Sequence, residues 1–185
     1  MRDAMADVAE SINEAQRMWG WYLALGILLI LTGVYAIYAG SAATIASVIV
    51  LGAVLFIAGI FQLVAAFMVR GAGHVVLMLL VGVLDIVVGI MLMQHPDAGA
   101  LTITLLLAAL FVFDGIYRFV AALVLQFPQY GWAAFSGIIS IVLGVMLWMQ
   151  FPASAGWFIG FAVGLNFIFA GISWSAVAWK LKPAS

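Results

Sequence analysis

Apolar residues form six long runs along the chain, and polar residues gather in the short segments between them. Each run has about twenty residues or more, the length that an α-helix needs to cross about 30 Å of hydrocarbon. Strands of a membrane barrel would alternate apolar and polar residues over about ten positions, and no such pattern is visible. The sequence therefore predicts an all-α integral membrane protein with six transmembrane helices, near residues 21–39, 43–68, 74–94, 98–126, 131–150 and 155–179.

The spans repeat along the chain. Glycines of the first, third and fifth spans recur at an offset of 55 or 56 residues, and so do small residues of the second, fourth and sixth spans. This periodicity predicts three tandem two-helix hairpins, about residues 20–71, 72–130 and 131–180, within one transmembrane domain of residues 20–180. Because every hairpin enters the membrane in the same direction, we expect parallel repeats related by rotation about the membrane normal.

The recurring glycines have a packing explanation. A step of seven residues places two small residues on one helix face, and small residues let helices in lipid approach closely. We therefore expect close helix packing at the following positions: Gly26, Gly33, Gly52, Gly59, Gly82, Gly89, Gly115, Gly137, Gly144, Gly164 and Gly171.

The composition supports a membrane protein. Of the 185 residues, 68% are hydrophobic and 7% are charged, whereas a soluble domain is about half apolar and about a quarter charged. The net charge of −1 argues against a nucleic-acid partner. The absence of cysteine excludes thiolate chemistry, and two distant histidines do not make a metal signature. We expect no metal, no cofactor and no enzymatic activity.

Basic residues predict the orientation. With six spans both termini lie on one side, and that side carries Arg2, Arg17, Arg70, Lys180 and Lys182, while the opposite loops contain no Lys or Arg. The positive-inside rule therefore places both termini in the cytoplasm. Residues 1–19 have the periodicity of an amphipathic helix with an acidic polar face. We expect this segment to dock on the cytoplasmic side of the protein or on a partner, with binding to lipid as the alternative. The first span, Trp21–Ala39, is expected to be retained and not cleaved as a signal peptide. Residues 181–185 form a cytoplasmic tail.

Asp114 and Arg118 are the first candidates for function, because ionisable residues inside spans are costly and rare. They stand four residues apart, so they share one helix face. At the helical rise they lie about 24 Å and about 30 Å from the outer start of their span. Three interpretations remain open: an ion pair that fixes helix register, part of a proton or ion pathway, or a contact between Arg118 and a lipid phosphate.

Other polar residues extend this candidate cluster. Asp85 lies near the middle of the third span, where an ionised carboxylate needs a cation or several donors. Because Asp85 and Asp114 belong to one predicted hairpin, both are candidates to meet Arg118. Gln62 and Asn166 are expected to form interhelical hydrogen bonds. His95 and His74 are candidate pH sensors because histidine titrates near neutrality, with an ordinary interfacial role as the alternative.

The sequence contains three tandem two-helix units with Gly-x6-Gly in each first helix, and the middle unit also contains Gly115-Ile116-Tyr117-Arg118. With these motifs the chain resembles the HdeD-like acid-resistance membrane proteins of bacteria. The resemblance covers about residues 19–180 and implies a multi-pass protein of the bacterial inner (plasma) membrane, linked to survival at low pH. It supplies no established catalytic or binding residues.

These observations lead to three hypotheses of function. The first is a non-enzymatic structural or regulatory component that contributes to acid or envelope-stress tolerance. The second is a proton-coupled transporter or channel that uses Asp85, Asp114 and Arg118, although no proline interrupts a span, and broken helices are frequent in transporters. The third is a membrane scaffold for a partner protein. The lipid bilayer is the expected partner, and a homo-oligomer or a membrane-protein complex is left open.

Overall fold

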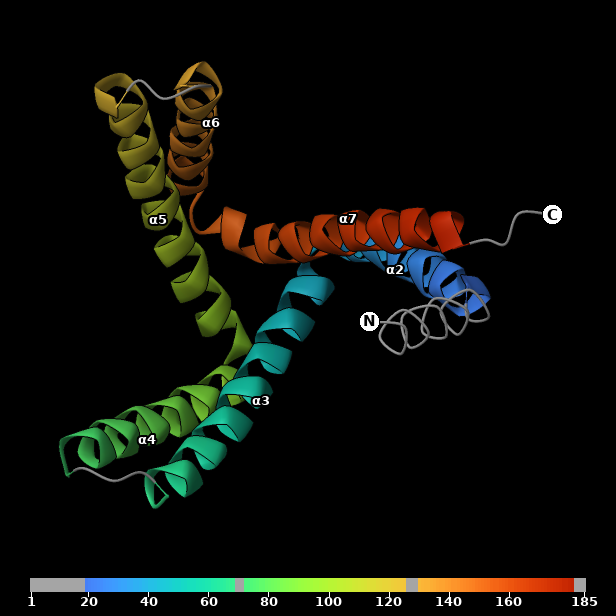
Figure 1. Ribbon diagram of the computed structural model, residues 1–185. Coiled ribbons are helices and arrows are strands. Elements are labelled where there is room, and N and C mark those ends of the chain that lie inside the picture. The colour runs from blue at the N-terminus through green and yellow to red at the C-terminus, as the bar shows by residue number, and fades with distance from the viewer. Residues whose placement is uncertain (1–18, 69–71, 126–129, 182–185) are drawn as a thin grey trace, which may run out of the picture. The chain divides into compact units, whose positions relative to one another are not determined.

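The computed structural model describes residues 19–68, 72–125 and 130–181, which form helices and no strand (Figure 1). Within these residues, six helices are long and apolar enough to cross a membrane, which confirms the all-α fold class. They are α2 (Trp19–Ala39), α3 (Ser41–Ala66), α4 (Ala72–Gln94), α5 (Pro96–Leu125), α6 (Tyr130–Met149) and α7 (Phe158–Leu181). The predicted amphipathic helix falls mostly on residues 1–18, and most of the predicted tail on residues 182–185; both segments lie outside the described residues.

The last span begins later than expected. The apolar run predicts a helix from residue 155, whereas α7 starts at Phe158. Residues Ala153–Gly156 form a separate 3-10 turn, η1, in which the Ser154 hydroxyl donates a hydrogen bond of 2.9 Å to the carbonyl oxygen of Leu147. This hydroxyl ties the turn to the last helical turn of α6.

The chain divides into two compact units. One contains residues 1–39 and 161–185, and the other contains residues Gly40–Gly160. The first unit thus holds α2 and most of α7, and the second holds α3, α4, α5, α6 and η1.

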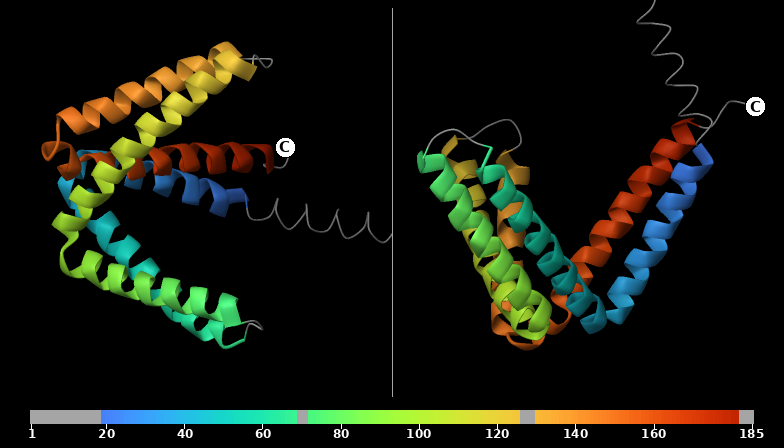
Figure 2. Two further views of the ribbon diagram at one scale, coloured as in Figure 1. Left: turned by 90° about the vertical axis from the view of Figure 1, so that its left-hand side faces the viewer. Right: turned by 90° about the horizontal axis from the view of Figure 1, so that it is seen from below.

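Glycine faces hold the helix pairs of the second unit together. Helix α3 lies alongside α4, and α5 lies alongside α6 (Figures 1 and 2). A Cβ atom added to Gly59 would lie 2.7 Å from the carbonyl oxygen of Gly82, and one added to Gly115 would lie 2.6 Å from that of Gly137. Side chains at these positions would collide with backbone, so the close approach requires glycine.

The same contact joins α2 to α7 in the first unit. An added Cβ at Gly33 would lie 2.5 Å from the carbonyl oxygen of Gly164, and one at Gly171 would lie 2.5 Å from that of Gly26. Towards one end of this pair, the rings of Tyr22 and Trp174 stack with centroids 5.6 Å apart and planes 3° apart. The first and the last helix of the described chain are therefore partners.

The observed helix pairs differ from the predicted hairpins. The glycine faces join α3 to α4 and α5 to α6, and in each case the two helices belong to different predicted hairpins. One residue, His95, separates α4 from α5, which leaves little chain for two helix bodies to lie side by side 8–10 Å apart. Five residues separate α3 from α4, and four separate α5 from α6. The longer connections allow the antiparallel, glycine-mediated packing.

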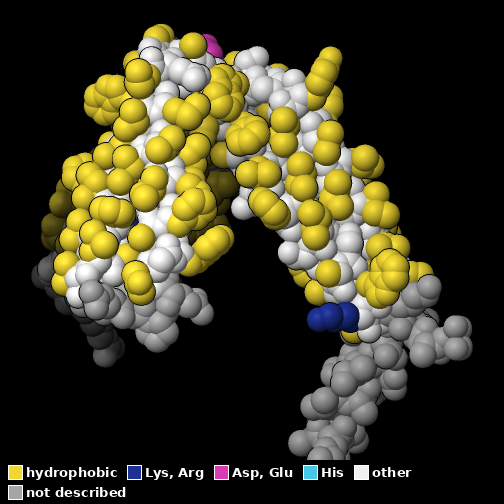
Figure 3. All heavy atoms as spheres, turned by 90° about the horizontal axis from the view of Figure 1, so that it is seen from above, with side chains coloured by type: hydrophobic (Ala, Val, Ile, Leu, Met, Phe, Trp, Pro, Cys, Tyr) yellow, Lys and Arg dark blue, Asp and Glu magenta, His cyan; other side chains and the backbone are white. Residues whose placement is uncertain are grey.

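Large apolar side chains cover the surfaces of the helices. Many of them are exposed in the isolated chain, among them Leu28, Leu84 and Val124, and Figure 3 shows hydrophobic side chains over most of the face in view. A soluble protein does not expose apolar patches of this extent. Membrane-spanning helices with such surfaces are in contact with the lipid bilayer.

Candidate functional site

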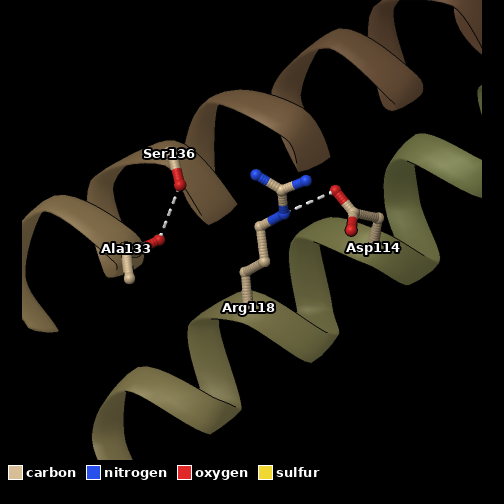
Figure 4. Close-up of polar contacts among 4 residues, drawn as sticks. All are labelled: Asp114, Arg118, Ala133 and Ser136. Atoms are coloured by element: carbon tan, nitrogen blue, oxygen red, sulfur yellow. Dashed lines mark hydrogen bonds and ion pairs between the residues drawn. The ribbon is translucent and has the colours of Figure 1, made fainter. Parts of the chain in front are cut away.

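Asp114 and Arg118 form an ion pair on α5. The Nε atom of Arg118 lies 2.8 Å from Oδ2 of Asp114, as the spacing of four residues allows. The two side chains are 53% and 43% exposed, for Arg118 and Asp114 respectively. In Figure 4 the arginine extends from α5 towards α6, near the turn where the Ser136 hydroxyl donates to the carbonyl oxygen of Ala133. The pair is a local contact along one helix, open on one side.

Asp85 does not join this pair among the described residues. It is half-buried in α4, and its carboxylate has no hydrogen bond or ion pair within the described part of the chain. The glycine face of α4 packs on α3, while that of α5 packs on α6. Asp85 and Asp114 therefore belong to different helix pairs, although α4 and α5 are consecutive.

The remaining sequence candidates are scattered. Gln62 is half-buried in α3, and Asn166 is exposed in α7, which belongs to the other unit at that point. His74 is exposed in the first turn of α4, and His95 is exposed between α4 and α5. The backbone of His95 is used twice, since its N–H donates to Met91 and its carbonyl oxygen accepts from Gly99. No metal-binding group of three or more His, Cys, Asp or Glu side chains occurs among the residues described.

A fully buried hydroxyl group stabilises the start of α7. Oγ1 of Thr44 accepts a hydrogen bond of 2.9 Å from the backbone N–H of Gly160, which lies in the first turn of α7. The first N–H groups of a helix have no partner within the helix, so Thr44 acts as a cap supplied by another helix. An added Cβ at Gly160 would lie 2.5 Å from the carbonyl oxygen of Gly40, so this approach also requires glycine.

A cavity of about 230 Å³ lies beside this contact, where the starts of α3 and α5 meet η1. Its polar lining includes Ser41, Thr44 and Asp97. The Asp97 carboxylate belongs to the first turn of α5, where the helix dipole favours a negative charge. The cavity therefore offers two hydroxyl groups and one carboxylate at the end of the helices that the basic residues predict to be extracytoplasmic.

The cavity is built from equivalent positions of the repeats. Ser41 and Asp97 are separated by 56 residues, and so are Thr44 and Ala100, which both line it. One turn further along the helices, Val48 and Thr104 have the same separation and are both fully buried. The candidate residues inferred from the sequence did not include Ser41, Thr44, Asp97 or Thr104. A signal for them is present in the sequence, because the repeat offset of 56 residues relates Ser41 to Asp97 and places Thr44 and Thr104 opposite Ala100 and Val48.

Comparisons with known proteins identify the repeat. A family model described as a short repeat of unknown function (DUF308) matches residues 24–94 and again residues 80–149. The two matches start 56 residues apart, which confirms the repeat length inferred from the glycines. No curated protein and no solved structure matches the chain. Because the two matches together cover well over half of the sequence, the chain belongs to the family of proteins that contain the short repeat of unknown function DUF308.

Proposed function

We propose that this protein is a non-enzymatic component of the bacterial inner (plasma) membrane that contributes to tolerance of acid or envelope stress. The observation that carries the proposal is how the hydroxyl groups within its helices are used. Those of Thr32, Ser47, Thr102 and Ser173 each donate to a carbonyl oxygen four residues earlier in the same helix. Hydroxyl groups used in this way serve the helix backbone, which favours a structural or regulatory role.

The DUF308 match supports the same proposal indirectly. It agrees with the resemblance to the HdeD-like proteins, which also rests on tandem repeats with a fixed glycine spacing. The acid-tolerance role itself comes from that resemblance.

A survival assay tests this proposal. The chain is expressed in a bacterial strain that lacks its own proteins of this repeat family, and survival and cytoplasmic pH are followed after a shift to strongly acidic medium. We expect higher survival and a slower fall of cytoplasmic pH than with the empty vector. A matched variant, Gly115→Leu, places a large side chain against the α6 backbone and should lose the effect. Equal survival with and without the wild-type protein would reject the role.

A second candidate function, proton transport or conduction, is favoured by Asp85. This half-buried carboxylate lies near the middle of a spanning helix and has no partner among the described residues. Ionisable residues inside membrane spans often mark the pathway of a proton or an ion. Asp114 and Arg118 would then be further polar groups along the route.

Proton flux into liposomes separates the two candidates. With an acidic outside and a neutral inside, a transporter or channel gives flux above that of empty liposomes, and Asp85→Asn or Arg118→Gln removes it. Flux at the lipid background in the wild type would reject transport and leave the structural or regulatory role.

A further inference from the structure

The ion pair of Asp114 and Arg118 leaves one side of each charged group open. Only Asp114 bonds to the Arg118 guanidinium among the described residues, through Nε. Figure 4 shows one terminal nitrogen of Arg118 directed away from Asp114, and the second carboxylate oxygen of Asp114 directed away from Arg118. The pair therefore presents hydrogen-bond donors at one point and an acceptor beside them, with no net charge.

The position of the pair along α5 places it near the lipid headgroups. Helix α5 has 30 residues, so it is about 45 Å long and exceeds the hydrocarbon thickness by about 15 Å. Arg118 precedes the last residue of the helix by seven positions, or about 10 Å. In a helix centred on the bilayer, Arg118 lies about 3 Å inside the hydrocarbon boundary, within reach of the headgroups by its long stem.

The open donors and the open acceptor need different partners. Guanidinium groups form strong paired hydrogen bonds with phosphate oxygens. An anionic headgroup would satisfy Arg118, but it would place a negative charge beside Asp114 with no positive charge to balance it. A headgroup that joins a phosphate to a primary ammonium satisfies both groups, because its charges are complementary to those of the pair.

We propose that Asp114 and Arg118 form a binding site for a zwitterionic phospholipid with a primary ammonium group, phosphatidylethanolamine being the simplest example. The phosphate accepts hydrogen bonds from the terminal nitrogens of Arg118, and the ammonium donates to the open oxygen of Asp114. Phosphatidylcholine is excluded from the second contact because its quaternary nitrogen has no N–H.

The repeat explains why this site occurs once among the described helix pairs. The positions equivalent to Asp114 and Arg118 are Ala170 and Trp174 in α7, where Trp174 stacks on Tyr22. In α3 the equivalents are Ala58 and Gln62, which carry no charge. The three pairs thus share a backbone arrangement, and α5 alone bears the two charges.

Lipid retention measured by native mass spectrometry tests the proposal, which does not depend on the proposed function. The full chain is exchanged from detergent into an equimolar mixture of phosphatidylethanolamine, phosphatidylcholine and phosphatidylglycerol with identical acyl chains. We expect the wild type to retain phosphatidylethanolamine about tenfold over phosphatidylcholine, equivalent to about 1.4 kcal/mol. Equal retention of these two lipids, or a preference for phosphatidylglycerol, would overturn the proposal.

Two variants locate the site. Arg118→Gln should remove the preference, and Asp114→Asn should shift it towards phosphatidylglycerol, because the remaining guanidinium then attracts an anion. Asp97→Asn is the matched control, since it removes a carboxylate from the first turn of the same helix, and it should retain the wild-type preference. Loss of the preference in the control, or its survival in Arg118→Gln, would place binding elsewhere. If a variant fails to fold, the relative retention of the three lipids by the wild type still tests the proposal.

Discussion

Thr44 and Thr104 are both fully buried, and within the described part of the chain only Thr44 has a hydrogen-bond partner for its hydroxyl group. Thr44 accepts from the N–H of Gly160, whereas Oγ1 of Thr104 has no partner among the described residues. Burying a hydroxyl group without a hydrogen bond costs free energy. The same residue type in the same end of the unit therefore has opposite effects on stability.

Substitution by valine, which is close in shape, should separate these effects. Thr44→Val leaves the Gly160 N–H buried without its partner, so we expect the free energy of unfolding to fall by about 1–3 kcal/mol. Thr104→Val removes an unpaired hydroxyl, and we expect a change within about 1 kcal/mol, in the stabilising direction. Valine already occupies the equivalent position at Val48. Thermal unfolding in detergent, followed by circular dichroism, measures both; a larger loss for Thr104→Val would contradict the assignment.

At the scale of single residues, sequence reasoning works where spacing alone decides. Asp114 and Arg118 stand four apart on a helix, and the structure brings their side chains together. The sequence also makes Asp85 a candidate for this contact, because it lies in the other helix of the same predicted hairpin. Its placement depends on which helix faces pack together, and local spacing carries no information about that choice.

At the scale of the element, glycines mark the surfaces where helix backbones touch. Gly115 is enclosed, because an added Cβ would lie 2.6 Å from the carbonyl oxygen of Gly137 and 2.7 Å from Cγ1 of Ile141. Gly131, in the first turn of α6, has nothing within 4 Å of the same added atom. The two positions form a matched pair for testing close approach.

We expect Gly115→Ala to lower the free energy of unfolding by about 1–3 kcal/mol, since α5 and α6 must separate to accept the methyl group. Gly131→Ala should cause no loss, because its methyl group meets no atom and alanine favours helix. Unfolding of both variants in detergent, followed by tryptophan fluorescence, provides the comparison. A similar loss in both would mean that backbone flexibility, and not helix contact, explains these glycines.

The elements themselves are predictable because the bilayer dictates their length. Each apolar run corresponds to an observed helix with similar bounds, apart from the late start of α7. The partners are less predictable, because the same seven-residue step between small residues occurs in every span and so identifies a contact face without identifying its partner. Within the second unit the pairs agree with connection length: one residue separates α4 from α5, whereas longer segments separate α3 from α4 and α5 from α6.

At the scale of the whole molecule, the pairing of α2 with α7 joins the beginning and the end of the described chain. The chain has no native cysteine, so engineered cysteines report this contact directly. We expect Tyr22→Cys combined with Trp174→Cys to form a disulfide on mild oxidation, because the native rings stack there. Trp21→Cys combined with Trp174→Cys is the control, since Trp21 is 79% exposed. Equal cross-linking of both pairs, judged by gel mobility before and after reduction, would argue against the pairing.

The basic residues predict the orientation of the whole molecule, and this prediction can be tested in the same cysteine-free background. Arg70 belongs to the connection between α3 and α4, whereas the connections at Gly40, His95 and Phe151 contain no Lys or Arg. The positive-inside rule then places the start of α4 in the cytoplasm and the start of α3 outside.

Labelling of single-cysteine variants with a membrane-impermeant maleimide should distinguish the two sides. In intact cells, Ser41→Cys and Ala153→Cys should react, because both positions are exposed at connections that lack basic residues. Gly73→Cys, exposed in the first turn of α4, should react only after the membrane is permeabilised. The opposite labelling pattern would mean that the molecule has the inverted orientation in the membrane. It would then place the cavity beside Asp97 in the cytoplasm and the Asp114–Arg118 pair in the outer leaflet, so this experiment also assigns the leaflet from which the proposed phospholipid is drawn.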